Sequence, residues 1–548
     1  MQKFPYIAIR VSIYIFLITL FFSLFNLINS LSIGLSLITI CILERNQIHH
    51  LARSIIYNIR EFIEIIPLGL LITLQALYSP PTTTDALNYH LVRVYFWLQN
   101  GSIFQNQIIT THDYMPKFGN ILQLWAFAIG GDWLAWLPQF LSWIGVGILS
   151  YLLFGLVYKS KDMEYKKRVV YIITSMPMLV LQASSTQIDL ISTFYFLLSM
   201  YFLITYLKKS HLKLLLYAVT AFCFALLTKP TVIFASAILL VIVVPKIKGI
   251  PLTHKLLSLI FFIVFSASWI IDIFYNYGYL AITQPQGNEN LSYITGKLTI
   301  GSTIVAVLKN MLLQLPIPLF DIKLHDLLSK LAQIVNAPLN DITQNFNATQ
   351  FSVRKYIYPQ EDVASNPIQL LLIFWGTCAV KIQKFNSSTP VRIFWGAIIG
   401  FILFSTVLRW QPWHSRLHIP FIIAALLAVF ALTKIKHIKQ ISYLSLLVGY
   451  AMVLLNTSKP YIDYTLIENQ VSHISQEAAT IPKPFWQRER TDAYFISQPN
   501  LYKDYSTLSY RYKNNDVCEI SKKNQMMYGL IILVNQNRLQ PCYFVSVE

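Results

Sequence analysis

Residues 5–26 read PYIAIRVSIYIFLITLFFSLFN, and residues 29–43 read NSLSIGLSLITICIL. These apolar runs decide the fold class, because a helix of about 20 predominantly apolar residues crosses a hydrocarbon core about 30 Å thick. Lys3 and Arg10 at the start of the first run imitate a secretory signal peptide. No cleavage site of small residues follows, and the second run begins at once, so we expect an uncleaved first membrane helix.

The composition of the whole chain is also strongly apolar. Of its 548 residues, 55% are hydrophobic and only 12% are charged, whereas a soluble globular chain carries about 25% charged residues. The mean hydropathy is +0.51. These values exclude a disordered, coiled-coil, collagen-like or small disulfide-rich protein and indicate a polytopic membrane protein.

Apolar runs recur along most of the chain, and we expect about thirteen transmembrane helices. The runs are residues 5–26, 29–43, 62–78, 133–157, 169–185, 190–207, 212–227, 231–245, 256–275, 367–380, 393–408, 417–433 and 441–456.

The basic residues predict the orientation of these helices. A net charge of +18 would suggest nucleic acid as the partner of a soluble chain, but here the lysines and arginines gather in short segments between apolar runs. With the N-terminus inside, the inner segments hold 22 of the 43 basic residues and the short outer loops hold five. Basic residues concentrate on the cytoplasmic side of membrane proteins. We therefore expect a multi-pass protein of the cell (inner or plasma) membrane, with a cytoplasmic N-terminus, an extracytoplasmic C-terminus and no nucleic-acid partner.

The domain organisation follows from this topology. We expect a transmembrane catalytic domain over residues 1–456, with outer loops at 79–120 and 276–366, and a small extracytoplasmic α+β domain over 457–548. In the latter, Tyr528–Val534 (YGLIILV) has the composition of a buried strand. Cys518 and Cys542 also lie there, so the oxidising outer compartment permits a disulfide between them, and the sequence leaves open whether it forms.

The first outer loop holds an unusual group of polar residues. Asp85, Tyr89 and Arg93 recur every four residues, with His90 beside them, which places them on one face of a helix. One interpretation is that Asp85 only caps this helix. The alternative is that a carboxylate, a phenol, an imidazole and a guanidinium form part of a reaction site at the membrane surface.

Three further outer features extend this pattern. His112 and Asp113 stand side by side later in the same loop. Asp189 lies at a short turn between two apolar runs, where it serves either as a helix cap or as a second reactive acid. Lys229 stands alone between apolar runs, where it is either a lysine whose amine reaches the headgroup layer or the partner of an anion.

The last outer feature is the segment RWQPWHSRLH at residues 409–418. Arg409 and Arg416 lie in it, with His414 between them. Tryptophan is expected at any membrane surface, but two guanidinium groups in a short outer loop are not, and their planar geometry suits phosphate. Acids on one set of outer loops and cations on another fit transfer from a lipid-linked phosphate donor. In that reaction a carboxylate deprotonates the acceptor and cations stabilise the departing phosphate. We expect Lys229 and Arg416 to hold this phosphate, with Arg409 and His414 in support.

The order of these motifs resembles a known family. Residues 85–102 carry the pattern Asp-x-Leu-x-Tyr-His-x-x-Arg-x-x-x-Trp-Leu-Gln-Asn-Gly-Ser, and Met115-Pro116, Ser185-Thr-Gln-x-Asp189, Thr228-Lys229-Pro-Thr and Trp410-Gln-Pro-Trp413 follow in order. Over roughly residues 60–430, this is similar to the bacterial polytopic glycosyltransferases of the GT-C type related to family 39, which include protein mannosyltransferases and aminoarabinose transferases.

The resemblance implies a polyprenyl-phosphate sugar as the donor and an inverting transfer of a hexose or pentose. It also implies that Asp85 is the catalytic base, with Asp189 and Asp113 assisting, and that Tyr89, His90, Arg93 and His112 line the substrate pocket. Unlike the protein mannosyltransferases, this chain has no Asp-Glu pair at residues 85–86. The acceptor, whether a glycan, a lipid or a protein, stays open for this reason.

Two other functions remain alternatives. A transporter or flippase is expected to have inverted repeats and charges near the membrane midplane, whereas these charges lie at the ends of the apolar runs. A polysaccharide ligase or polymerase that uses a lipid pyrophosphate needs paired arginines on a large outer loop. No required cofactor is expected, although the carboxylates and histidines make a divalent cation possible. The bound partners expected are membrane lipids, the lipid-linked sugar and the acceptor.

Overall fold

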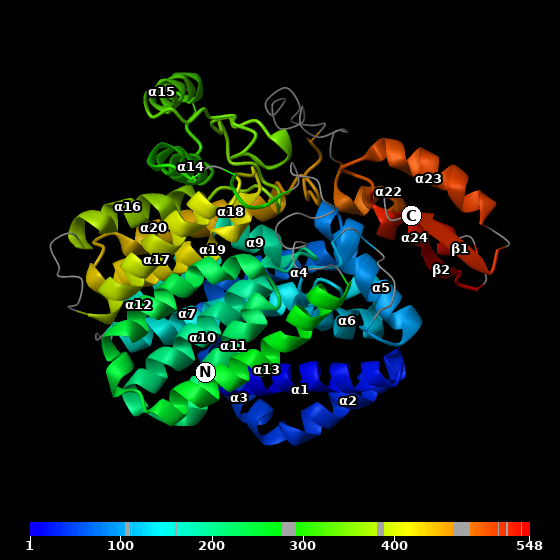
Figure 1. Cartoon of the computed structure of the whole chain (residues 1–548), viewed down its shortest axis with the longest axis horizontal. Helices are drawn as coiled ribbons and strands as arrows, with labels where there is room; N and C mark the ends of the chain where they lie inside the picture. Colours follow the sequence, from blue (N-terminus) through cyan, green and yellow to red (C-terminus); the bar gives the residue numbers. More distant parts are fainter. Residues whose placement is uncertain are drawn as a thin grey trace. The chain divides into compact units, whose positions relative to one another are not determined.

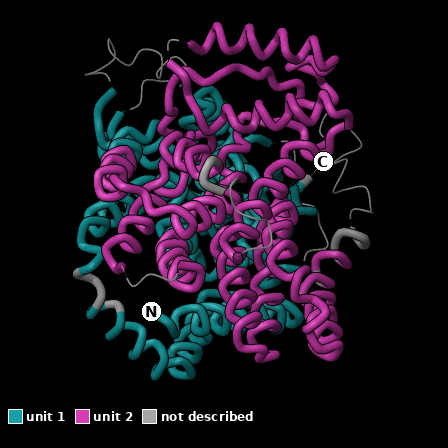
Figure 2. Tube along the Cα trace, turned by 90° about the vertical axis from the view of Figure 1, so that its left-hand side faces the viewer, with its two compact units in different colours: residues 1–142, 181–191, 451–548 teal, residues 143–180, 192–450 magenta. Residues whose placement is uncertain are grey.

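The structure is a computed structural model that describes most of the chain. It covers residues 1–104, 110, 112–158, 162–276, 292–296, 298–318, 320–380, 388–464, 483–512, 515–521, 524–536, 538 and 540–547. Figure 1 shows that helices dominate it, with two short strands near the C-terminus. Two compact units divide the chain (Figure 2): unit 1 comprises residues 1–142, 181–191 and 451–548, and unit 2 comprises residues 143–180 and 192–450.

Unit 1 contains both ends of the chain. Its elements are α1 (Phe4–Leu24), α2 (Ser30–Leu43), α3 (Arg45–Asn58), η1 (Ile59–Ile65), α4 (Ile66–Tyr78), η2 (Ala86–His90), α5 (Leu91–Asn100), α6 (Phe118–Gly130), η3 (Gly131–Trp133), η11 (Phe485–Gln487), α22 (Arg490–Ala493), α23 (Pro499–Arg511), β1 (Val517–Ser521), α24 (Met527–Gln536) and β2 (Tyr543–Val547).

Unit 2 contains the middle of the chain. Its elements are α8 (Met163–Thr174), α11 (Leu212–Leu226), η4 (Pro230–Ala235), α12 (Ser236–Val243), η5 (Val244–Gly249), α13 (Leu252–Asn276), α14 (Ile300–Leu312), α15 (Asp321–Ile334), η9 (Phe346–Ala348), α16 (Pro367–Val380), α17 (Thr389–Val407), α18 (His414–Leu417) and α19 (Ile419–Leu432). Four helices contribute residues to both units: α7 (Leu137–Val157), α9 (Pro177–Ala183), α10 (Asp189–Lys209) and α20 (Ile438–Leu454).

The expected helical membrane fold is confirmed. Within the described residues, six helices are long and apolar enough to cross a membrane: α1, Glu61–Tyr78, α7, α10, Pro230–Gly249 and α17. The pair formed by α2 and the start of α3 bends by 73°. The expected runs at 212–227, 256–275, 367–380, 417–433 and 441–456 fall on shorter apolar helices. The run at 169–185 is broken into α8 and α9 before Pro177, because proline cannot continue the hydrogen-bond ladder of the preceding helix.

The C-terminal segment corrects one expectation. Residues 528–534, predicted as a strand, belong to the helix α24, which connects the parallel strands β1 and β2. Parallel strands require such a crossover. Nearly every residue of this stretch is buried, including Tyr528, Leu530 and Val534. A helix covered on all sides has the same continuous apolar sequence as a buried strand, so periodicity cannot separate the two.

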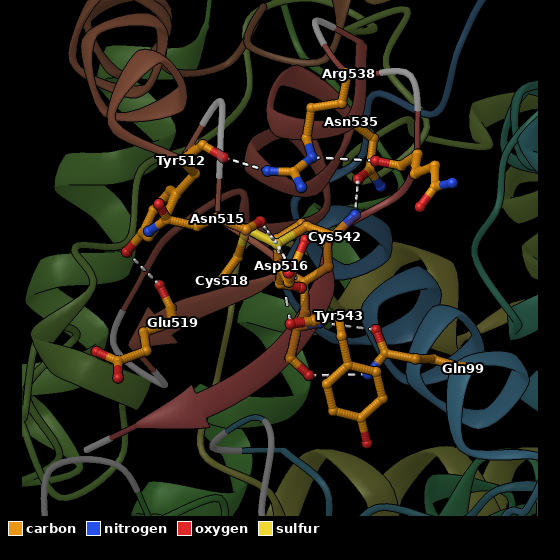
Figure 3. Close-up of a disulfide and its surroundings, with 12 residues drawn as sticks. Gln99, Tyr512, Asn515, Asp516, Cys518, Glu519, Asn535, Arg538, Cys542 and Tyr543 are labelled. Atoms are coloured by element: carbon orange, nitrogen blue, oxygen red, sulfur yellow. Dashed lines mark hydrogen bonds between the residues drawn. A yellow bond between two sulfur atoms is a disulfide. The ribbon is translucent and has the colours of Figure 1, made fainter.

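Cys518 and Cys542 are joined by a disulfide, which ties β1 to the residue that precedes β2 (Figure 3). Both cysteines belong to a hydrophobic cluster that also includes Leu87, Leu91 and Phe96 of the first outer loop. Arg490 and Tyr494 bind the carboxylate of Asp132, with an ion pair of 3.0 Å from Arg490. The C-terminal segment and the first outer loop therefore share one core. The boundary at 456/457 and the outer position of residues 276–366 stay predictions. Residues 277–291, 297 and 319 of that loop lie outside the described residues.

Candidate active site

Asp85 lies where the first outer helix begins, but the helix does not use it as a cap. Its backbone is helical (φ −62°, ψ −42°), and its side chain makes no capping hydrogen bond. The turn that follows, η2, is a π turn, closed by a bond from the amide of Leu91 to the carbonyl of Ala86. Single π turns inside helices are frequent at functional sites. The capping interpretation of Asp85 therefore has no support from this helix.

The π turn brings aromatic residues of the loop together. Tyr89 lies against His90, with ring centroids 4.2 Å apart, and stacks on His112, with centroids 4.7 Å apart and planes at 17°. Burial lowers the pKa of His112, the carboxylates of Asp85 and Asp113 oppose this shift, and the guanidinium of Arg93 adds to it. Asp85 is thus close enough to act electrostatically on the half-buried imidazole of His112.

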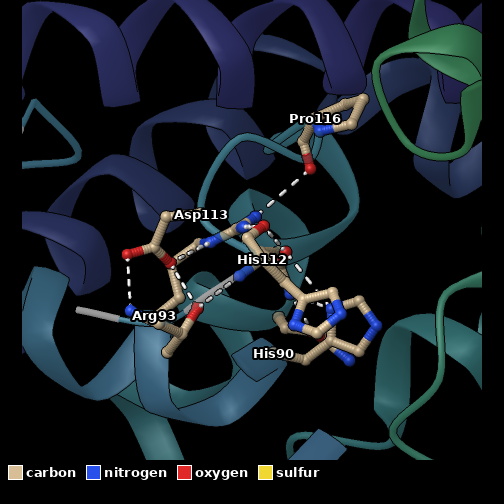
Figure 4. Close-up of polar contacts among 8 residues, drawn as sticks. His90, Arg93, His112, Asp113 and Pro116 are labelled. Atoms are coloured by element: carbon tan, nitrogen blue, oxygen red, sulfur yellow. Dashed lines mark hydrogen bonds and ion pairs between the residues drawn. The ribbon is translucent and has the colours of Figure 1, made fainter. Parts of the chain in front are cut away.

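Arg93 organises the loop from within (Figure 4). Its side chain is buried, donates to the carbonyls of Pro116 (3.3 Å) and His112 (2.8 Å) and to Asn120 Oδ1 (3.0 Å), and lies 3.7 Å from Asp113. Asp113 also accepts bonds from the amide and hydroxyl of Thr110, at 2.8 and 2.7 Å. Both residues therefore fix the conformation of the loop. The assisting role expected of Asp113 stays a prediction.

A chain of amides connects this loop with the turn before Asp189. His90 Nδ1 lies 3.0 Å from the amide nitrogen of Asn120, which donates to Gln123 (2.8 Å), and Gln123 donates to the carbonyl of Thr186 (2.6 Å). Asp189 is buried and is the first residue of α10. Unit 1 thus gathers all three expected acids, Asp85, Asp113 and Asp189, with the four expected pocket residues. Asn120 and Gln123 were missed, although two amides three residues apart in the apolar α6 are a usable signal.

Lys459 is a second residue that the sequence analysis missed. It is 1% exposed and donates to the carbonyl of Ser184 (2.7 Å), in the turn that leads to Asp189. Gln75 of α4 binds the carbonyls of Lys459 (2.6 Å) and Val453 (3.0 Å) and accepts a bond from Ser184 (3.0 Å). A buried lysine thus lies beside the turn of a proposed catalytic acid. Nothing in the sequence around residue 459 indicated its burial.

The expected cations of residues 409–416 lie in unit 2 and have partners there. Arg409 Nε donates to the carbonyl of Ile294 (3.1 Å), and Arg416 forms a 2.6 Å ion pair with Asp362. His414 is buried and lies 3.0 Å from Asn310 Oδ1. Burial, followed by the charges of its neighbours, lowers its pKa well below the ordinary range. His414 is therefore neutral at pH 7 and offers a hydrogen bond rather than a charge.

Two more buried basic residues join this cluster. Lys309 of α14 binds Asn345 and the carbonyl of Leu339 (2.9 Å) and lies 5.2 Å from the centre of the Trp410 ring. Its burial lowers its pKa to about 7. Arg354 donates to the carbonyls of Leu313 (2.9 Å) and Pro412 (2.5 Å). Arg354 therefore fixes the loop that carries Arg409 and Arg416, which sequence spacing alone did not reveal.

Lys229 lies just before η4, at the end of α11, and is partly exposed. In unit 2, η4 packs against α17, the helix that leads to Arg409. As for a metal, no group of three or more His, Cys, Asp or Glu side chains among the described residues is arranged to hold one. The possible divalent cation stays a prediction without a site.

Comparison with known proteins identifies the fold. No protein-family model matches the chain, and no curated protein matches it in sequence. The crystal structure of ArnT from Cupriavidus metallidurans bound to undecaprenyl phosphate matches 88% of this chain and 85% of its own, with a TM-score of 0.51 and 10% identity. The chain has the GT-C fold. ArnT from the same organism in the apo state matches 82% of this chain and 69% of its own, with a TM-score of 0.45 and 12% identity.

The GT-C fold agrees with the resemblance inferred from the sequence motifs. At 10% identity, the likeness concerns the arrangement of the helices. It does not test the roles expected of Asp85, Asp189, Lys229 and Arg416, which stay predictions.

Proposed function

We propose that this protein is a membrane glycosyltransferase that moves a sugar from a polyprenyl-phosphate donor to an acceptor hydroxyl on the extracytoplasmic face. One observation carries the proposal: in a chain with the GT-C fold, Asp85 stands at a π turn within electrostatic reach of the half-buried His112 and makes no capping hydrogen bond. The ArnT structure with this fold holds undecaprenyl phosphate, which supports the same donor class here.

The chemistry assigns a role to each group. The carboxylate of Asp85 accepts the proton of the acceptor hydroxyl while the oxygen of that hydroxyl forms a bond to the anomeric carbon of the sugar. The bond from that carbon to the phosphate oxygen breaks, and polyprenyl phosphate leaves with the bonding electron pair. Attack opposite the leaving group inverts the anomeric configuration. Asp189 and Asp113 assist, and Tyr89, His90, Arg93 and His112 shape the sugar pocket.

The departing phosphate needs positive charge. Lys229 and Arg416 are proposed to supply it, with Arg409 as a further guanidinium and His414 as a hydrogen-bonding group. The 2.6 Å ion pair of Arg416 with Asp362 restricts the orientation of its guanidinium, which favours bidentate binding of a phosphate. The proposal places these residues on the extracytoplasmic side of the cell membrane, opposite the cytoplasmic N-terminus.

A donor panel tests the function. The purified protein is incubated with radiolabelled polyprenyl-phosphate hexoses and pentoses and with a membrane extract as the source of acceptor, and the release of polyprenyl phosphate is measured. We expect release from at least one donor by the wild type and its loss in Asp85→Asn. Release by neither protein from any donor, in the presence of the native acceptor fraction, contradicts the proposal.

A further inference from the structure

The helix that carries the proposed catalytic residues has a second face, and the C-terminal segment covers it. Leu87, Leu91, Val92 and Phe96 of η2 and α5 belong to one buried cluster with residues of α24, β1 and β2. Tyr89, His90 and Arg93, on the other hand, contact the polar residues of their own loop. The position of this helix therefore depends on what the C-terminal segment presents to it.

Asn88 makes the first directional contact, inside the π turn itself. Its side-chain oxygen accepts a 2.6 Å hydrogen bond from the amide of Met526, the residue before α24. Met526 has a φ of +51°, in the left-handed region that residues other than glycine rarely adopt. Such a conformation persists only where its surroundings hold it. The Asn88 bond therefore joins two unusual backbone sites, the π turn and the start of α24.

Gln99 makes the second contact, near the end of α5. Its amide nitrogen donates to the carbonyl of Phe544 (2.8 Å), and its oxygen accepts from the amide of Phe544 (2.9 Å). Both main-chain groups of Phe544 thus bond to Gln99, so the side chain pairs with β2 as a neighbouring strand would. Tyr95, one turn earlier, accepts a 3.1 Å bond from Asn535 of α24.

The C-terminal segment is itself stiffened at these contact points. The disulfide between Cys518 and Cys542 ties β1 to the start of β2, two residues from Phe544, and the Cys542 amide donates to Asn535 (3.0 Å). The groups that bind Gln99 and Tyr95 are therefore connected to the cross-link within a few residues. Asn88 and Gln99 thus bind the two ends of the helix to one C-terminal segment, which the disulfide cross-links.

We propose that Asn88 and Gln99 are positioning residues, through which the C-terminal segment holds the helix of Asp85, Tyr89 and Arg93 in the arrangement needed for sugar transfer. This inference rests on the proposed function. A helix fixed only by apolar contacts can slide or rotate slightly at little cost, because such contacts have no direction. Hydrogen bonds at its two ends define its rotation and its register.

Variants that change only the hydrogen bonds test this inference in the full-length protein. Asn88→Leu removes the acceptor at similar volume, and Asn88→Asp restores it. Gln99→Met removes both bonds to Phe544 and keeps the length of the side chain. Thr507→Val is the matched control, because its hydroxyl bonds only within α23 and its side chain is exposed.

We expect Asn88→Leu and Gln99→Met each to lower kcat about tenfold, which corresponds to about 1.4 kcal/mol, with an unchanged KM for the donor. Hydrogen exchange of residues 84–100 should rise in both variants. Asn88→Asp should recover both the wild-type kcat and the slow hydrogen exchange. Because this variant adds a charge near Asp85, the kcat of each protein is measured at the optimal pH of that protein. Thr507→Val should match the wild type.

Two results overturn the inference: wild-type kcat in both variants, or an equal loss in Asn88→Asp and Asn88→Leu. If Asn88→Leu does not fold, the kcat and hydrogen exchange of Gln99→Met, at the other end of the helix, decide whether the inference holds. Hydrogen exchange requires no turnover, so it tests the positioning role of Asn88 and Gln99 separately from the proposed glycosyltransferase function. Faster exchange that Asn88→Asp reverses supports the positioning contact even if no polyprenyl-phosphate sugar is used, and that absence of transfer counts against the proposed function alone.

Discussion

The imidazole of His112 stacks on the phenol ring of Tyr89, with ring centroids 4.7 Å apart and planes inclined by 17°. The two residues come from opposite ends of the first outer loop, and Arg93 reinforces the contact by donating to the carbonyl of His112. Offset aromatic stacking adds about 0.5–1.5 kcal/mol beyond the burial of the rings. The end of this loop is thus fastened directly to the turn that follows Asp85.

The first prediction concerns Asp85 as the base. Asp85→Asn keeps the size of the side chain but removes its basic oxygen, and the helix loses no capping bond because none exists. We expect normal expression and a fall in sugar transfer of about 10²–10⁴-fold, the range for loss of a general base. Transfer is measured as labelled sugar incorporated into the acceptor fraction of membranes.

Asp326→Asn is the control for this experiment, because Asp326 is an exposed carboxylate on α15. It should transfer sugar at the wild-type rate. If Asp85→Asn keeps most of its activity, the assignment of Asp85 as the base is contradicted. Asp189 is then the next candidate for the base.

Local patterns were enough to predict much of this site from sequence. The apolar runs gave the helical membrane fold, and the outer loops gave the acids, aromatic residues and guanidinium groups that unit 1 and unit 2 gather. Asp85 and Tyr89 were recognisable because they share one predicted helix face with Arg93, and His112 because it stands beside a second acid in the same loop. The four-residue spacing nevertheless predicted the shared helix face only approximately, because the π turn at 86–90 contains one residue more than an α-helical turn.

The rest depended on tertiary contacts that no local pattern encodes. Lys459 is buried because Gln75 and Ser184, far away in sequence, surround it. Lys309 lies in a segment whose sequence resembles an ordinary amphipathic helix, and its burial comes from Asn345 and Trp410. The helix α24 was predicted as a strand because burial on all sides removes the periodicity that separates helix from strand.

The second prediction tests the donor phosphate site. Lys229→Met keeps the apolar stem of the side chain and removes its charge, so we expect weaker donor binding and slower release of polyprenyl phosphate. Loss of one charge-assisted hydrogen bond to a phosphate is worth about 1.5–3 kcal/mol, or about 10–150-fold in affinity. Binding is measured by displacement of a labelled polyprenyl phosphate from the purified protein.

Arg416 provides the companion variant. Arg416→Lys keeps the charge but loses the planar fork, so we expect an intermediate loss of affinity and an increased salt sensitivity. Unchanged donor affinity in Lys229→Met, with Arg416→Lys equally unaffected, would contradict the assignment of this phosphate site.

The third prediction concerns the disulfide. Cys518 and Cys542 are 24 residues apart in sequence, and closing a loop of that size stabilises a fold by about 3.5 kcal/mol in the chain-entropy description. The double variant Cys518→Ser, Cys542→Ser should therefore lower the melting temperature of the C-terminal segment and expose it to trypsin. Proteolysis followed by mass spectrometry locates the cleavage.

Dithiothreitol added to the wild type should reproduce this sensitivity, and it should change nothing further in the double variant. Equal resistance of the wild type and the double variant to trypsin would contradict a stabilising role for the cross-link.

The last prediction is a pH dependence that His112 contributes. Burial lowers the pKa of His112 in the folded protein, whereas in the unfolded chain it titrates near the ordinary value of about 6.5. Below that pH the unfolded state binds more protons than the folded state, so the free energy of unfolding decreases as the pH falls. The contribution of this one group cannot exceed about 1.4 kcal/mol per pH unit.

His112→Phe isolates this contribution, because phenylalanine keeps the stack on Tyr89 and does not titrate. Melting temperatures of both proteins in detergent are compared from pH 8 to pH 5. We expect similar differences between the two proteins at pH 8 and pH 7, where His112 is neutral in both states, and a smaller loss of stability in His112→Phe below about pH 6.5. Parallel curves over the whole range would show that His112 takes up its proton equally in the folded and unfolded states, and would contradict a lowered pKa of His112 in the folded protein.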